Sequence, residues 1–224
     1  MFRQYRPFAK GEFILVGVDT AAGGNDYCAA QFVSHKNIDV PLIYHSPKMA
    51  TEMTNELFPV LEKIHDVTGI RPVIAYERAN GGVFELERLA AMNRLSKFTV
   101  FKMPTIGQVA RTGSDLPEAV RLGWDTNTAT RPAMLSQLKE AIDSQVLRIY
   151  DKITIEELYS FIIAQTSSSW KAQAEVGAHD DTVMALAIAW QLYQLCPVPK
   201  SQQAQAQQMA QIPDERLFNE DGFY

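Results

Sequence analysis

Hydrophobic and polar residues along the chain follow two spacings, one typical of strands and one typical of helices. Short apolar runs bounded by glycine or polar turns predict buried strands, at residues 13–19, 27–34, 41–45, 73–77, 98–101 and 147–150. Apolar residues three and four apart predict helices, at residues 51–68, 82–95, 132–144, 153–165 and 180–195. The first three strands predict an antiparallel meander, and the later strands alternate with helices. We therefore predict an α/β fold with a central mixed β-sheet flanked by helices.

The two ends of the chain differ in composition from its middle. Residues 1–12 carry Arg3, Arg6 and Lys10 before the first acidic residue, and they predict an N-terminal arm. Two prolines after residue 195 end the last helix, and six glutamines follow within residues 201–212. Such a segment has little that could pack. We expect a globular domain over residues 13–195 and a glutamine-rich flexible tail over residues 196–224.

Overall composition excludes several classes of protein. A chain of 224 residues with 46% hydrophobic and 21% charged residues is neither collagen-like nor wholly disordered. It holds no run of about 18 apolar residues, so we expect no membrane span. Two cysteines are too few for a disulfide scaffold or a four-cysteine zinc site and favour a reducing, intracellular location. A net charge of −5 argues against a globally basic nucleic-acid binder, while a local basic face or an acidic metal site remains open.

Four acidic residues stand where strands end or a helix begins. Asp19 ends the first strand, Glu77 ends a later strand, and Asp180 and Asp181 open the last helix. Such positions project side chains into a cleft from rigid supports. Two like charges about 4 Å apart cost about 4 kcal/mol at an effective dielectric constant of 20, and a divalent cation removes that cost. Oxygen ligands of this kind select Mg²⁺ or Mn²⁺.

Each of these acids also has an ordinary structural interpretation. Asp19 precedes a glycine-rich turn and could serve as a turn-former. Asp180 and Asp181 could be an N-cap and first-turn pair favoured by the helix dipole. Glu77 is harder to explain in this way, because a carboxylate buried without a partner is costly. His179 has a capping or core role, or it touches a substrate or a second metal.

The ordered set of motifs resembles the nuclease domain of the large terminase subunit of tailed bacteriophages. The resemblance rests first on Val16–Asp19, Ala75–Asn80 and Gly177–Ala185, and the last of these is the most specific. The segments Leu122–Asn127, Thr130–Leu135 and Ile153–Leu158 also fit. Together they cover residues 13–195. The resemblance implies an RNase H-like fold and cutting of double-stranded viral DNA with two divalent ions, Mg²⁺ or Mn²⁺.

The same resemblance implies roles for individual residues and partners. Asp19 matches the aspartate that bridges both ions, Glu77 matches the second acidic position, Asp181 matches the aspartate of the third motif, and Asp180 matches an adjacent acid found in some members. A complete large terminase carries an ATPase domain first, and no Gly-x-x-x-x-Gly-Lys-Ser/Thr motif occurs here. Residues 1–12 then correspond to the connection from that domain. Portal protein, the small terminase subunit and the ATPase domain are the implied partners, in the host cytoplasm and away from membranes.

Basic residues offer candidate contacts to DNA phosphates. Residues 78–111 contain six basic and two acidic residues, a balance that could meet a phosphate backbone. Arg78 is the candidate beside Glu77 in the chain. Arg131 and Lys139 are further candidates on the predicted helix that runs to residue 144. Ordinary surface charge explains each of them equally well. No motif that reads base edges is present, so we expect little sequence preference.

Three other classes of function remain open. Another nuclease of the RNase H-like superfamily, such as a resolvase or transposase, is the nearest rival. An actin-like nucleotide-binding ATPase also places an aspartate before a glycine-rich turn, although the chain is short for two such subdomains. A non-catalytic packaging or docking module is the third class, and the intact set of acids argues against it.

Overall fold

A mixed sheet forms the centre of the molecule. The computed structural model describes residues 1–20, 27–103, 121–165 and 179–199, with the backbone alone described for 161–165. In spatial order the sheet holds β1 (Phe2–Gln4), β4 (Asp39–Ser46), β3 (Cys28–Ser34), β2 (Ile14–Asp19), β5 (Val73–Tyr76) and β6 (Thr99–Val100). The pairs from β1 to β2 are antiparallel, and β2–β5 and β5–β6 are parallel. The predicted meander and mixed sheet are confirmed.

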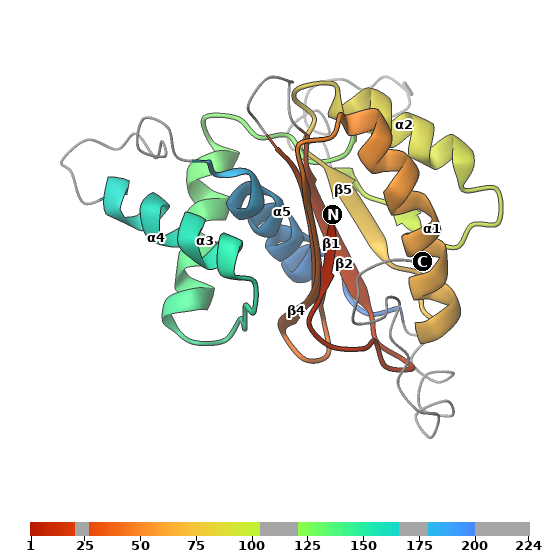
Figure 1. Ribbon diagram of the computed structural model, residues 1–224, viewed down its shortest axis with the longest axis horizontal. Helices are drawn as coiled ribbons and strands as arrows, with labels where there is room; N and C mark the ends of the chain where they lie inside the picture. The colour runs from red at the N-terminus through yellow and green to blue at the C-terminus, as the bar shows by residue number, and fades with distance from the viewer. Residues whose placement is uncertain (21–26, 104–120, 166–178, 200–224) are drawn as a thin grey trace, which may run out of the picture.

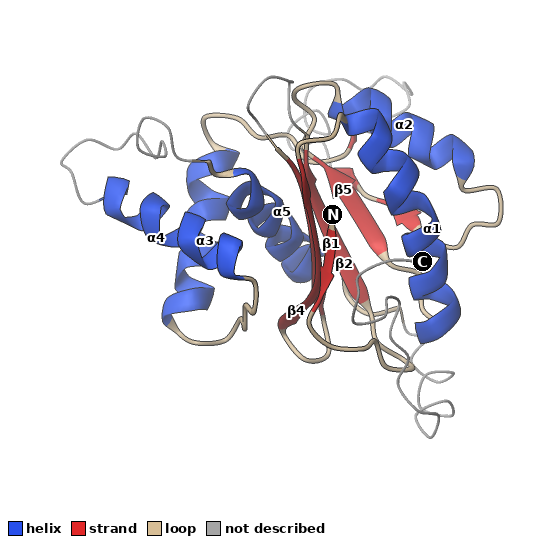
Figure 2. Ribbon diagram, viewed as in Figure 1, coloured by secondary structure: helices blue, strands red, loops and turns tan. Residues whose placement is uncertain are grey.

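Helices cover both faces of this sheet. Figures 1 and 2 show two helices on one face, α1 (Ala50–Thr68) and α2 (Gly82–Met92), and three on the other, α3 (Thr130–Asp143), α4 (Lys152–Gln165) and α5 (Asp181–Leu195). Side chains of strand β2 pack against both helix layers, because successive side chains of a strand point to opposite faces of the sheet. Leu15 packs in the core with α5, while Ile14 and Val16 pack in the core with α1.

Strand β2 and helix α5 touch backbone to backbone at Gly17. A Cβ atom placed on Gly17 would lie 2.2 Å from the carbonyl oxygen of Ala185 and 2.3 Å from the amide nitrogen of Ala189. Only glycine permits this approach. Because Gly17 lies two residues before the end of β2, the contact brings that end of the strand to the start of α5.

One predicted strand is wrong, and two elements end earlier than expected. Residues 147–150 form no strand; Arg148 makes an isolated bridge to Asp39 instead. The reason is that β1 already occupies the outer edge of β4, pairing with residues 42–44. Helix α2 ends at Met92 rather than at residue 95, and the strand expected over 98–101 is reduced to β6. A second, two-stranded antiparallel sheet pairs β7 (Lys102–Met103) with β8 (Arg121–Leu122).

The N-terminal residues expected to form an arm contribute to the sheet and core. Phe2 pairs with Tyr44 across β1 and β4, and Phe8 is fully buried. Arg6 contacts both Glu12 and Asp39. The division into an arm, a domain and a tail stays a prediction, and most of the predicted tail, from residue 200 onward, lies outside the described residues.

Candidate functional site

Asp19 and Glu77 lie side by side because their strands are parallel neighbours in register. Val18 pairs with Tyr76, and the amide of Glu77 donates to the carbonyl of Val18 at 2.8 Å. Asp19 is the last residue of β2 and Glu77 comes directly after β5, and each is only 8% exposed. The carboxyl ends of parallel strands meet at one edge of a sheet, so the two side chains share one end of the sheet.

The chain turns sharply after Glu77 to begin α2. Asn80 and Gly81 have positive φ angles of 51° and 82°. A Cβ atom on Gly82 would lie 1.9 Å from the carbonyl oxygen of Glu77. On the other side of Glu77, the backbone of Trp124 pairs with the chain: Trp124 donates to Tyr76 at 2.8 Å and accepts from Arg78 at 2.9 Å. These contacts hold the backbone of Glu77 from both sides.

Asp180 and Asp181 reach the same end of the sheet from the start of α5. Asp180 occupies the N-cap position but makes no capping hydrogen bond with its side chain; its Oδ2 pairs with Arg131 Nη2 at 2.7 Å. Asp181 Oδ2 accepts a hydrogen bond from the Tyr27 amide at 3.3 Å and lies 3.7 Å from His179 Nδ1. The ordinary capping role therefore does not account for Asp180. His179 is exposed, so a core role for it is wrong.

The pKa of Asp19 reports the effect of the other three acids on this residue. Burial raises the pKa of Asp19 well above its ordinary value, and the charge of Glu77 and a hydrogen bond with it raise that pKa further. The charges of Asp181 and Asp180 add to the shift in the same direction. A buried carboxylate surrounded by other carboxylates is costly to ionise. The structure thus brings together the four acids that the sequence singled out.

A hard divalent cation fits these residues in ligand type and in charge. The four side chains offer carboxylate oxygens, and a cation would remove the repulsion that raises the pKa of Asp19. In the part of the chain that is described, however, no three His, Cys, Asp or Glu side chains are already arranged around one ion position. Arg131 holds one carboxylate and the Tyr27 amide another, so binding would exchange these contacts for the ion.

Glu157, on α4, belongs to this region and was not predicted. Its Oε2 accepts hydrogen bonds from the Thr182 amide at 2.9 Å and the Thr182 hydroxyl at 2.6 Å. Burial raises the pKa of Glu157 to about 7 despite these bonds, and the charge of Asp181 contributes. In the sequence, its only sign was a carboxylate on the inner face of a predicted helix, three residues after Thr154.

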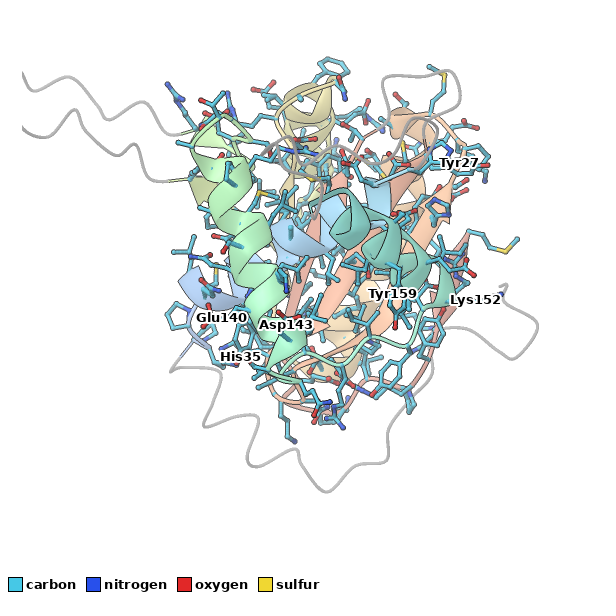
Figure 3. The ribbon with its side chains drawn as sticks, turned by 90° about the vertical axis from the view of Figure 1, so that its left-hand side faces the viewer. Tyr27, His35, Glu140, Asp143, Lys152 and Tyr159 are labelled. Carbon is cyan, nitrogen blue, oxygen red and sulfur yellow. The ribbon has the colours of Figure 1, made fainter. Side chains whose placement is uncertain are left out.

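The basic candidates differ in their distance from the acids. Arg131 touches Asp180 directly, and Arg78 follows Glu77 and donates to the carbonyl of Leu122 at 2.5 Å. Lys139 lies eight residues beyond Arg131 on α3, about 12 Å along the helix, and pairs with Asp143. Figure 3 shows Asp143 at the end of α3 far from Tyr27. The structure therefore brings Arg131 to the acids, turns the guanidinium of Arg78 toward Leu122, and leaves Lys139 away from them.

Other members of the predicted basic stretch already have acidic partners. Arg88 pairs with buried Glu85 at 2.8 Å, and Lys97 pairs with Asp66 at 2.6 Å. Arg111 lies outside the described residues. A continuous basic face over residues 78–111 therefore has little support in the described part of this stretch.

Solved structures of phage proteins share this architecture. The large terminase nuclease from thermophilic phage G20c, solved with bound magnesium, matches with a TM-score of 0.60 at 15% identity, over 85% of this chain and 86% of that chain. The large terminase nuclease domain of Thermus phage P74-26 matches with a TM-score of 0.57 at 13% identity, over 89% of each chain. The fold is that of a large terminase nuclease domain. The RNase H-like α/β fold expected from the motifs is confirmed.

Sequence comparison adds no further relatives. No family model matches the chain, and no curated protein matches its sequence. At the identities given above, the likeness to the terminase nucleases is one of fold. The G20c nuclease has also been solved with bound cobalt and with bound zinc, and both structures match this chain. Among the described residues, no helix is both long enough and apolar enough to cross a bilayer.

Proposed function

We propose that this protein is a metal-dependent endonuclease that cuts double-stranded viral DNA during genome packaging. One observation carries the proposal: the charges of Glu77, Asp181 and Asp180 all act on buried Asp19, at one end of the sheet. The fold is shared with terminase nucleases, one of them with bound magnesium. The packaging role, and the portal protein, small terminase subunit and ATPase domain as partners, follow from that likeness and from the motifs.

Asp19, Glu77, Asp180 and Asp181 would hold the cation, Mg²⁺ or Mn²⁺, and the resemblance implies two ions. When bound, a divalent ion activates water and stabilises negative charge developing on a phosphate. The role of the protein chain is to hold the ligand carboxylates in place. Asp19 and Glu77 are fixed by the β2–β5 register, and the Tyr27 amide orients Asp181.

Arg131 supplies the positive charge nearest these acids among the described residues. Its guanidinium pairs with Asp180, and a guanidinium also binds phosphate oxygens well. Arg78 is the neighbour of Glu77 in the chain, and its guanidinium donates to the carbonyl of Leu122. Contacts of this kind recognise the DNA backbone rather than base edges, so cutting is expected to show little sequence preference.

Plasmid cleavage tests the proposal directly. Wild-type protein with Mg²⁺ or Mn²⁺ should nick and linearise supercoiled plasmid, whereas Asp19→Asn and Glu77→Gln should not, with unchanged circular dichroism. The matched control is Asp66→Asn, an exposed acid on α1 that pairs with Lys97, and it should cut like wild type. Cleavage by Asp19→Asn at the wild-type rate overturns the assignment.

Two parallel assays separate the rival functions. A resolvase-like nuclease would prefer a four-way DNA junction over linear duplex, and an actin-like ATPase would hydrolyse ATP without DNA. We expect equal cutting of junction and duplex, and no ATP hydrolysis. A strong junction preference or DNA-independent ATP hydrolysis would favour the corresponding rival.

A further inference from the structure

The start of α5 is capped by another helix. A helix leaves its first backbone amides without partners inside the helix, and a side chain at the N-cap normally accepts from one of them. Asp180 stands at the N-cap and makes no such bond. Glu157, from α4, takes this role by accepting from the Thr182 amide at 2.9 Å.

Thr182 is held from several directions. Its hydroxyl donates to Glu157 at 2.6 Å, and its carbonyl accepts from Gln31 Nε2, on β3, at 3.3 Å. Gln31 in turn donates to the hydroxyl of Thr154, on α4, at 2.8 Å. Thr182 is fully buried. The residue next to Asp181 is thus fixed by both α4 and the sheet.

We propose that Glu157 is a positioning residue for the metal-binding acids, acting through Thr182 to hold Asp181 against Asp19. The inference rests on the function proposed above. Oε2 of Glu157 is already engaged by two donors of Thr182, which makes it a support for a ligand rather than a ligand. Groups that orient a metal ligand typically change metal affinity or activity by about 10- to 100-fold when removed.

Three variants separate acceptor, charge and location. Glu157→Ala removes the acceptor, and Glu157→Gln removes the charge but keeps an oxygen that can accept from Thr182. Glu156→Ala is the matched control. Glu156 and Glu157 line one pocket together with His179, but Glu156 is exposed and pairs with Lys152 at 3.4 Å. Metal affinity is measured by the Mn²⁺ dependence of the melting temperature and, separately, of plasmid cleavage.

A positioning role predicts a specific pattern. Glu157→Ala should need about 10- to 100-fold more Mn²⁺ for half of the melting shift and for half-maximal cleavage, and saturating Mn²⁺ should restore most of the cleavage rate. Glu157→Gln and Glu156→Ala should stay within about threefold of wild type. Wild-type Mn²⁺ affinity in Glu157→Ala overturns the inference. A Glu157→Gln variant as defective as Glu157→Ala also overturns it, because the carboxylate of Glu157 would then act on the ion directly through its charge.

Two further points keep the test decisive. Should Glu157→Ala fail to fold, Thr182→Val, which removes one of the two hydrogen bonds with little change of shape, should raise the required Mn²⁺ at least threefold; wild-type affinity there overturns the inference. Failure of the proposed function looks different. In that case the wild-type protein itself would show no metal response and no cleavage.

Discussion

The two ends of strand β2 both bury carboxylates, and they differ in what neutralises them. Before β2 begins, Glu12 and Asp39 are almost fully buried and both contact Arg6, at 2.5 and 2.6 Å. Beside β1, at the edge of the sheet, Asp151 likewise contacts an arginine, Arg3, at 2.7 Å. At the far end, about 20 Å away along the strand, the groups that act on Asp19 are other acids.

The pKa directions make the difference concrete. Burial alone would raise the pKa of Asp151, but hydrogen bonds from Arg3 and Tyr5 bring it below its ordinary value. Burial raises the pKa of Asp19, and neighbouring acids raise it further. Glu12, Asp39 and Asp151 are each paired with an arginine of the chain itself, and these pairs serve the fold. The second end has an excess of negative charge that an external cation can neutralise, as expected of a binding site.

The largest expected effect is on cleavage, and it separates Asp180 from Asp181 at the end of β2 where the four acids meet (the acid end). Asp181 is more enclosed than Asp180, with side-chain exposures of 13% and 29%, and its charge acts on Asp19 more strongly. Asp181→Asn should lower plasmid cleavage by more than about 100-fold, since even orienting groups contribute up to about that much. Asp180→Asn should lose less and recover at high Mn²⁺. The reverse ranking would contradict the assigned roles.

At the start of β2, where Arg6 contacts Glu12 and Asp39, removal of the arginine should affect stability and not cleavage. Arg6→Ala leaves Glu12 and Asp39 buried without their shared partner, which should lower the free energy of unfolding by about 3 kcal/mol. Urea unfolding measures this change. Lys139→Ala, which breaks the exposed pair with Asp143, should stay within about 1 kcal/mol of wild type. An Arg6→Ala protein as stable as wild type would show that these acids tolerate isolation.

Divalent metal should stabilise the acid end selectively. Mg²⁺ or Mn²⁺ at about 100 times its dissociation constant adds about 2.7 kcal/mol if it binds only the native state. The wild-type melting temperature should therefore rise with metal, and Asp19→Asn should lose this response. Sodium chloride at equal ionic strength is the control, and an equal rise with sodium chloride would remove the case for a specific site.

The last prediction concerns pH in the absence of metal. The pKa of Glu157 rises from an ordinary 4.5 to about 7, and that of Asp19 lies well above 3.8. Between the ordinary and the raised values the folded state binds more protons, so stability falls as pH rises. Urea unfolding in EDTA from pH 5 to 8 should show this fall, less steeply in Asp19→Asn. Asp151 has the opposite sign: its stabilisation is lost at acid pH, as the pH falls through its lowered pKa. Identical slopes for wild type and Asp19→Asn would contradict the coupling of Asp19 to its neighbours.

Local patterns predicted most of the architecture and singled out the four acids that the fold places at one end of the sheet. The β2 and β5 runs, and the polar residue that ends each, are visible within a few residues of sequence. Pairings between distant residues were not predictable in this way. Glu157 and Thr182 are 25 residues apart, and Arg131 and Asp180 are 49 apart. The prediction of a strand at 147–150 was wrong for the same reason: the sequence of that segment does not show that β1 occupies the edge of β4.

The contact at Gly17 restricts which sequences this site can tolerate. Positions 17, 185 and 189 share one small volume, since the strand backbone meets the backbone of the helix there. Even a methyl group at position 17 would push α5 away from β2 and carry Asp181 away from Asp19. In a saturation library, position 17 should accept nothing but glycine, with a loss as complete as that at the acids themselves. The spacing of the acids thus depends on the absence of a Cβ atom at position 17.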